Sequence, residues 1–268
     1  MPINSGYFLP GGELLVGRES GFFETYKGIV ETSTGKVQAY VKMLHKRALA
    51  GELVCTVLGQ AAGLPVPNGY LIEVRQEDYP ESSFLKSQGL KSTIAFGSEE
   101  LNAPSLARRY EGSDEAAFDF LLNTWQRWQE AMLFDEWVAN PDRHPGNFLV
   151  NGPNDVWLID HSHAFRGPNW DANDLKAGAY TKNLIATHAG RRMTLPDRHK
   201  LLTKLTGIGG DYEKLTVSAI VEESRALHFL SENDLQALRR FLEQRVKELP
   251  RLVARHVGIP MFSEMEAS

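Results

Sequence analysis

The spacing of apolar residues changes in character near residue 100 of this 268-residue chain. Before that point, short β-type runs such as YKGIV at 26–30 and VQAYVKML at 37–44 alternate with turn residues. Beyond it, apolar residues recur at helical intervals. The change predicts an α+β protein of two unlike lobes, a β-rich lobe at residues 1–100 and a mainly helical lobe at residues 101–268. The junction between two such lobes is a common place for a ligand.

Further elements of the first lobe follow from its turn and helix signals. A helix is predicted over residues 47–62, where Gly63 ends it and two prolines prevent a restart. Two more strands are predicted over residues 69–74 and 92–96. A connector near residues 97–105 then leads into the second lobe.

The second lobe contains mostly helical patterns. One long helix is predicted over residues 115–139, ended by Pro141, whose ring disfavours helix for the residue before it. Two short strands, NFLV and VWLI, follow around a turn. Pro196 is expected to open a later helix that Gly207 closes, and Ser231, with an acidic residue three positions on, has the pattern of a helix cap.

Composition excludes several classes of protein. The formal charge of −5 and the pI near 5.9 give no reason to expect direct nucleic-acid or membrane binding over a broad surface. The N-terminus has no pattern of a signal peptide, and no apolar run reaches the ~20 residues of a membrane span. The lone Cys55 cannot form an internal disulfide, which fits a reducing cytoplasm. Charges near Arg240 and Arg245 indicate a solvated helix face.

The stretch NPDRHPGNFLV at 140–150 concentrates chemically active side chains beside a Pro-Gly turn. Asn147 follows Asp142 at an interval of five residues, and Asp160 comes thirteen residues after Asn147, beyond the second short strand. A loop–strand–turn–strand unit would bring these three side chains to one end of a hairpin. Phosphoryl transfer needs such a set, because a carboxylate must accept the proton of the attacking hydroxyl and oxygen ligands must hold magnesium on the triphosphate.

The same chemistry needs a lysine on the phosphates and a lid above them. Lys42 lies inside an apolar strand, where an unpaired ammonium group would be costly, and Glu52 on the following helix is its expected partner. Upstream, Gly17 and Gly21 flank a turn between strands, where exposed backbone N–H groups could bind phosphate. Ser20 is one of the residues between them.

The segments DRHPGN and WLIDHSHAF resemble the catalytic and metal-binding motifs of the HipA-like kinases and, more distantly, of the phosphatidylinositol kinases. The passage GELVCTVLGQAAGLPVP is similar to small HipA-like proteins, so the resemblance covers roughly residues 26–165. It implies a two-lobed protein-kinase-like fold that uses ATP and Mg²⁺. Asp142 would then be the catalytic base, with His144 near the transferring phosphate. Asn147 and Asp160 would bind the metal, and Lys42 would hold the α- and β-phosphates.

The resemblance also implies further roles and partners. Phe96, Gly97 and Ser98 would form a hinge whose backbone binds adenine, and Ser20 stands where family members autophosphorylate. The acceptor would be a Ser/Thr hydroxyl of a protein, and an inhibitory, DNA-binding partner would silence the enzyme, as for toxins in the family. The metal motif departs from the kinase pattern, since Asp160 is followed by His-Ser in place of Phe-Gly, and no Ala-Pro-Glu follows.

Other functions remain open at this point. The acceptor could be an inositol lipid or a small molecule with a hydroxyl group. The cluster of His144, Asp160, His161 and His163 could instead hold zinc in a metal-dependent hydrolase. A third reading is a nucleotide-binding module that keeps the fold without turnover.

Overall fold

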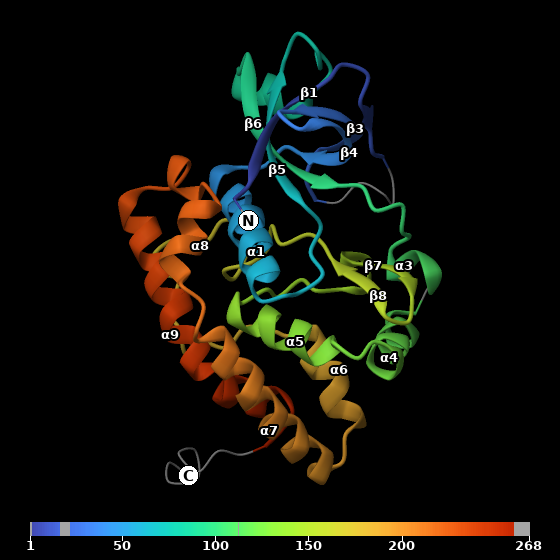
Figure 1. Ribbon diagram of the computed structural model, residues 1–268, viewed down its shortest axis with the longest axis vertical. Coiled ribbons are helices and arrows are strands. Elements are labelled where there is room, and N and C mark those ends of the chain that lie inside the picture. The colour runs from blue at the N-terminus through green and yellow to red at the C-terminus, as the bar shows by residue number, and fades with distance from the viewer. Residues whose placement is uncertain (1, 17–21, 112, 260–268) are drawn as a thin grey trace.

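The computed structural model describes residues 2–16, 22–111 and 113–259, and its first lobe is built on one six-stranded sheet (Figure 1). The strand order in this sheet is β1-β5-β6-β4-β3-β2, mostly antiparallel, with β1 parallel to β5. The strands are β1 (Asn4–Phe8), β2 (Glu13–Leu14), β3 (Thr25–Thr32), β4 (Gly35–Lys42), β5 (Gly69–Arg75) and β6 (Ser92–Glu99).

The hairpin between β3 and β4 forms at the predicted turn. Gly35 adopts a φ of +132°, a conformation that residues with a Cβ rarely reach, and the Thr32 hydroxyl donates to the Gly35 carbonyl at 2.8 Å. This turn sets the register along both strands, from Thr32 opposite Gly35 to Thr25 opposite Lys42. The register places Lys42 at the last position of β4, where the strand leads toward the helix below the sheet.

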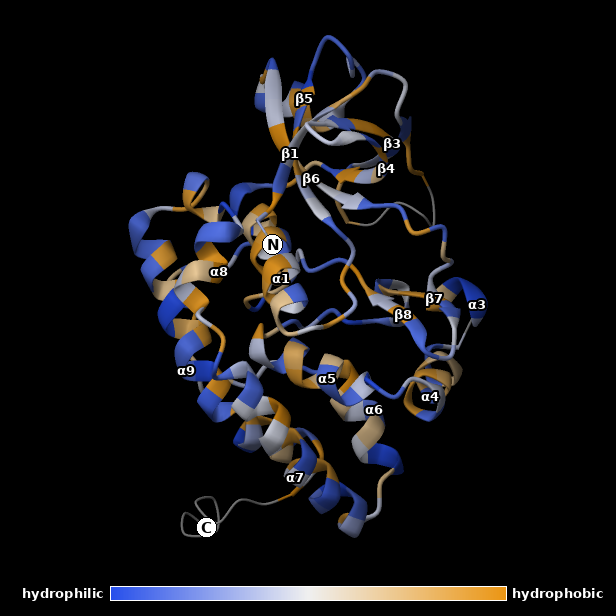
Figure 2. Ribbon diagram, in the orientation of Figure 1, coloured by the Kyte–Doolittle hydropathy of each residue, from blue (hydrophilic) through white to orange (hydrophobic). Residues whose placement is uncertain are grey.

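Helix α1 (Lys46–Ala61) lies between the sheet and the helical half of the molecule (Figure 1). It is buried on all sides from Ala48 to Gly59, and most of its residues there are apolar (Figure 2). Its end matches the prediction, because Gly63 takes a φ of +72° and donates its N–H to the Gln60 carbonyl.

The rest of the described chain is mainly helical, and it lies below the sheet in the view of Figure 1. A short helix, α2 (Ser83–Gln88), belongs to the first lobe. The α-helices beyond the sheet are α3 (Leu106–Arg109), α4 (Asp114–Thr124), α5 (Trp128–Trp137), α6 (Leu184–Arg192), α7 (Leu195–Tyr212), α8 (Val217–Glu223) and α9 (Glu232–His256). Two 3₁₀ turns, η2 (Pro145–Asn147) and η3 (Ala226–His228), and the hairpin β7 (Phe148–Gly152) with β8 (Asp155–Leu158) complete the fold.

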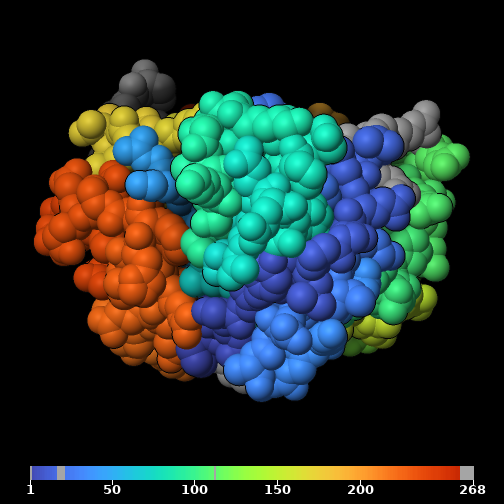
Figure 3. Space-filling model, turned by 90° about the horizontal axis from the view of Figure 1, so that it is seen from above, coloured from blue at the N-terminus to red at the C-terminus, as the bar shows by residue number. Residues whose placement is uncertain are grey.

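Two apolar clusters stabilise the two halves. The smaller one lies within the sheet around Phe8, Tyr26 and Ile72, whereas the larger one joins α1 to the helices below it. Seen from above, the first lobe covers the centre of the molecule and the C-terminal helices, in orange, lie along one side (Figure 3). The predicted α+β arrangement of a β-rich and a helical half is confirmed. The division at residue 100 stays a prediction, since α1 precedes it and yet packs into the larger cluster.

Two predicted helix boundaries are wrong. The single helix expected over residues 115–139 is two helices, because the chain becomes extended at Trp125, with ψ of 113°. The indole of Trp125 is buried there and meets the ring of Phe148 edge-on at 6.3 Å, a contact that no local pattern announces. Helix α7 continues past Gly207 because its buried face runs on through Leu205 to Tyr212.

The Ser231 cap is confirmed, since its hydroxyl accepts the Asp234 N–H at 3.1 Å at the start of α9. In the part of the chain that the structure describes, no helix has both the length and the apolar character needed to cross a bilayer.

Candidate active site

Lys42 connects the two halves of the molecule. Its ammonium nitrogen lies 2.8 Å from Glu52 Oε1 on α1 and 2.9 Å from Asp160 Oδ1, which follows β8. Glu52 is fully buried, whereas the side chains of Lys42 and Asp160 keep 15% and 26% of their surface exposed. The ion pair predicted between Lys42 and Glu52 is therefore present, and it extends to a second carboxylate at the edge of solvent.

Within this cluster, Lys42 and Asp160 stabilise each other's charges, whereas burial raises the pKa of Glu52. Burial alone would lower the pKa of Lys42, but attraction to Asp160 and Glu52 outweighs it and raises the pKa well above its usual range. Burial alone would raise the pKa of Asp160, yet Lys42 and the Ser162 hydroxyl hold it well below its usual range. Lys42 is thus a permanent cation and Asp160 a permanent anion, which suits a phosphate contact and a metal contact respectively.

The β7–β8 hairpin brings the predicted oxygen ligands together. Phe148 pairs with Leu158, and the N–H of Ile159 donates to the Asn147 carbonyl at 3.1 Å, so Asn147 and Asp160 lie near one end of the hairpin. The Asn147 side-chain amide donates to the Asp142 carbonyl at 2.7 Å. Among the described residues, no group donates to its Oδ1, which stays available to a cation.

Asp160 has a strained backbone. Its φ of +56° lies in the left-handed region, which an aspartate enters at a cost of order 1 kcal/mol. The surroundings impose this conformation, because the next N–H, of His161, donates to Glu52 Oε2 at 2.9 Å. Gly51 allows that contact, since a Cβ at this position of α1 would lie 3.1 Å from the His161 carbonyl oxygen.

Arg143 holds the loop in place, a role that the sequence did not reveal. It is 1% exposed, and its Nε lies 3.0 Å from Asp135 Oδ2 on α5. Its Nη1 donates to the carbonyls of Asn147 and Ile159. A single buried guanidinium therefore ties the helix before the loop to both strands of the hairpin after it.

Asp142, the predicted base, reaches solvent. Its side chain is 42% exposed, and its N–H donates to Asn140 Oδ1 at 3.0 Å. Two imidazoles flank its carboxylate, with His144 Nε2 4.0 Å and His163 Nδ1 3.6 Å from Oδ2. The side chain is thus free to meet an incoming hydroxyl group.

The donors present fit magnesium better than zinc. Within the described residues there is no cluster of three or more His, Cys, Asp and Glu side chains able to hold a metal. His161 is buried and its Nδ1 lies 2.9 Å from Arg143 Nη2, so that nitrogen accepts a hydrogen bond, and burial lowers the pKa of the ring well below its usual range. One amide and one carboxylate suit Mg²⁺, which takes few protein oxygens and completes its shell with phosphate and water.

Other predicted residues are placed differently or lie outside the described residues. Phe96, Gly97 and Ser98 stand inside β6, between β5 and β4, and are paired on both sides. Their backbone groups face these strands, and adenine binding by this segment stays a prediction. The chain leaves the sheet after Glu99. Gly17, Ser20 and Gly21, the predicted lid, fall in residues 17–21, which the structure does not describe.

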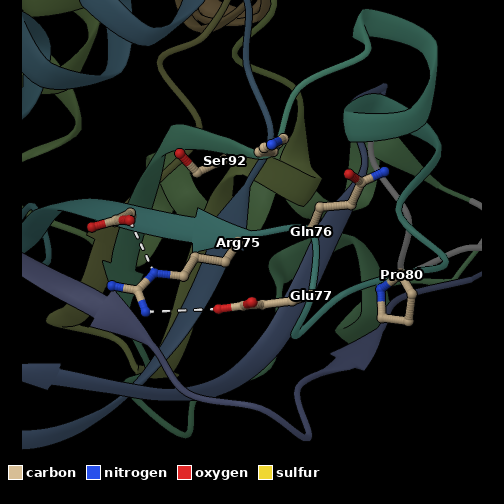
Figure 4. A pocket seen from close by; sticks show the side chains of 7 residues that line it. Arg75, Gln76, Glu77, Pro80 and Ser92 are labelled. Carbon is tan, nitrogen blue, oxygen red and sulfur yellow. Dashed lines mark hydrogen bonds and ion pairs between the residues drawn. The ribbon is translucent and has the colours of Figure 1, made fainter.

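A large hollow elsewhere does not resemble a phosphate site. It measures about 620 Å³ and lies on the first lobe beside the end of β5 (Figure 4). Arg75, its central cation, already pairs with Glu73 at 3.1 Å and Glu77 at 3.9 Å, and its guanidinium lies over the Tyr7 ring. Glu73 and Glu77 balance the charges of Arg75 and Lys91 in its lining, so this hollow has no net positive charge to attract a triphosphate.

Comparison with protein families gives a match to the model of the HipA-like kinases over residues 35–208. The chain belongs to the HipA-like kinase family. The match covers β4 with Lys42, α1 and the whole of the β7–β8 unit with Asp142, Asn147 and Asp160. The family predicted from the sequence is thereby confirmed, and with it membership of a kinase family.

A solved kinase structure has the same fold. The proinflammatory kinase CtkA of Helicobacter pylori matches with a TM-score of 0.58 at 14% identity, over 97% of this chain and 100% of that one. The HipA chain of a Shewanella oneidensis HipA–HipB–operator DNA complex matches with a TM-score of 0.46 at 14% identity, over 93% of this chain and 65% of that chain. No match was found among curated protein sequences. The predicted two-lobed, protein-kinase-like fold is confirmed.

Proposed function

We propose that this HipA-like kinase transfers the γ-phosphoryl group of ATP to a Ser or Thr hydroxyl of a protein. The observation that carries the proposal is the position of Lys42, whose ammonium contacts both Glu52 and Asp160. This contact brings the end of a strand from the first lobe to the metal-binding turn of the second. A cation and an anion held side by side in this way suit a triphosphate and its counterion.

The residues divide the work of the reaction as follows. Lys42 holds the α- and β-phosphates as a point charge, and Glu52 fixes the direction of its side chain. Asn147 and Asp160 would hold Mg²⁺, which when bound neutralises charge on the phosphate oxygens. Arg143 keeps the loop rigid, so that the distance between base and metal ligands is set before substrate arrives.

Asp142 orients the acceptor hydroxyl and takes its proton. Its carboxylate is exposed enough to meet a substrate, while its backbone is fixed by Asn140 and Asn147. Removing such a base typically lowers the rate roughly 10²–10⁴-fold. His144 lies two residues after Asp142, and its side chain is 46% exposed. Its proposed role is to contact the transferring phosphate.

The acceptor class and the setting rest on family membership. A protein hydroxyl follows from the HipA-like resemblance, while an inositol lipid or a small-molecule alcohol are the competing acceptors. Cytoplasmic location and an inhibitory partner protein are proposed on the same ground. Phosphorylation of Ser20 and phosphate binding by Gly17 and Gly21 are proposed from the family resemblance and the sequence alone, since these residues lie outside the described part of the chain.

Transfer from γ-labelled ATP to a cell extract, followed by mass spectrometry, tests the proposal. The unaltered chain is expected to label protein on Ser or Thr in a Mg²⁺-dependent way, and Asp142→Asn is expected to lower labelling by about 10³-fold. A matched control is Asp211→Asn, at an exposed aspartate on α7, which should keep full transfer. Label recovered only in lipid or in a small molecule would show that the acceptor is not a protein. Full activity of Asp142→Asn would show that Asp142 is not the base.

A further inference from the structure

The carboxylate of Asp142 has little to orient it within its own loop. Among the described residues no N–H or O–H donates to it at hydrogen-bonding distance, and the nearest polar atom is His163 Nδ1, at 3.6 Å from Oδ2. His163 comes from the other strand end, three residues after Asp160. A base that must meet a hydroxyl at a fixed angle needs a restraint, and His163 is placed to supply one.

The protonation of the His163 ring follows from its neighbour. Ser162 Oγ lies 2.7 Å from Asp160 Oδ1, a carboxylate that can only accept, so the single hydroxyl proton points to Asp160. Ser162 Oγ also lies 3.2 Å from His163 Nδ1 and can only accept there. The tautomer with a proton on Nδ1 satisfies this contact, and Nδ1 also lies 3.6 Å from Asp142 Oδ2.

We propose that His163, supported by Ser162, is a positioning residue that links the catalytic base Asp142 to the metal ligand Asp160. The link runs from Asp160 through the Ser162 hydroxyl to the His163 N–H and on to Asp142. Of the two residues that replace Phe-Gly, Ser162 belongs to this link, whereas His161 contacts Arg143. The inference rests on the proposed function and adds a device that couples the two halves of the reaction centre.

The ring of His163 is itself held by packing. It lies 6.0 Å from the Phe22 ring and 6.1 Å from the Phe23 ring, measured between centroids, and its side chain is 23% exposed. The imidazole therefore has two separable features, an aromatic body against two phenylalanines and one N–H directed at Asp142. Each feature can be removed without the other.

Two substitutions exploit this separation. His163→Phe keeps a ring against Phe22 and Phe23 but has no N–H, whereas His163→Asn loses the ring and keeps an N–H donor at the same number of bonds from Cβ as Nδ1. Positioning through the N–H predicts that His163→Phe lowers kcat about 10–100-fold with KM for ATP changed by less than about 3-fold, and that His163→Asn stays within about 5-fold of the unaltered chain.

The assay measures ADP release and labelling with ATP, Mg²⁺ and dephosphorylated casein, with melting temperatures recorded for each variant. Equal damage by both substitutions, or greater damage by His163→Asn, would assign the effect to ring packing and overturn the inference. So would full activity of His163→Phe. If His163→Phe does not fold, Ser162→Ala replaces it, with a several-fold fall of kcat expected and unchanged kcat contradicting the link. An unaltered chain that neither releases ADP nor transfers phosphate would remove the proposed function itself, and this inference with it.

Discussion

Two ion clusters of similar composition have opposite characters in this molecule. Where the two halves meet, Lys42 lies between Glu52 and Asp160, with Lys42 and Asp160 partly open to solvent. In the core of the helical half, Arg245 of α9 and Glu136 of α5 pair at 2.7 Å, and both side chains are 0% exposed. The first cluster joins the two halves, whereas the second lies wholly within one of them.

The clusters differ in what their polar atoms do. Arg245 donates to the Glu136 carboxylate and carbonyl and to the carbonyls of Ala177 and Ala179, so it fixes the segment between Asp160 and α6. In the Lys42 cluster, Asp160 Oδ2 has no donor among the described residues. A closed cluster of this kind holds structure, and an open one offers atoms to a ligand. Charge alone does not distinguish the two.

Removal of the core cation should have the largest effect. Arg245→Met leaves the buried Glu136 carboxylate with only His256 and Asn183 beside it, and the free energy of unfolding is expected to fall by about 3–5 kcal/mol. Chemical denaturation measures the change. Arg240→Met, at an exposed arginine on the same helix, is the matched control and should stay within about 0.5 kcal/mol. Equal free energies of unfolding for the two variants would show that the Arg245–Glu136 pair does not stabilise the fold.

Substitution of Asp160 in the Lys42 cluster should lower activity and leave stability nearly unchanged. Asp160→Asn keeps the Lys42–Glu52 pair but removes a metal-binding charge, so Mg²⁺-dependent phosphate transfer is expected to fall roughly 10²–10³-fold or more. The free energy of unfolding should change by no more than about 1 kcal/mol. Paired measurements of kcat and of unfolding test this contrast, and a variant as unstable as Arg245→Met would erase it.

A smaller effect is expected from a change in α1 where this helix packs against the turn at Asp160. At Gly51 a Cβ would meet the His161 carbonyl at 3.1 Å, so Gly51→Ala is expected to lower the free energy of unfolding by about 1 kcal/mol and to displace the turn at Asp160. Gly207→Ala in α7 is the matched control, since nothing lies within 4 Å of its Cβ position. It should raise stability by about 0.5–1 kcal/mol through helix propensity. If both substitutions changed the free energy of unfolding in the same direction, this would contradict the tight packing at Gly51.

The same contrast explains which parts of the site could be read from the sequence. Lys42 in an apolar strand needed a partner, and strand–turn–strand spacing was enough to bring Asn147 and Asp160 together. Arg245 was predicted to lie on a solvated helix face, and this was wrong, because its partners lie more than 60 residues away along the chain. Arg143 likewise contacts Asp135, which belongs to another element. Local patterns record what an element needs, whereas these contacts depend on how elements pack.

Fold prediction had the same limit. The hairpins and caps follow from local turn chemistry, as at Gly35 and Ser231. The break at Trp125 and the place of Phe96–Ser98 inside the sheet depend on packing and sheet order. The family resemblance supplied the overall fold, which neither composition nor periodicity could specify.

The most direct test of the open cluster is a crystal structure with a non-hydrolysable ATP analogue and Mg²⁺. The account predicts a triphosphate with Lys42 Nζ on its α- and β-phosphates, the metal on Asn147 and Asp160, and the γ-phosphate facing Asp142. A nucleotide bound elsewhere, with the Lys42–Asp160 contact of 2.9 Å intact and no metal on Asn147, would contradict it.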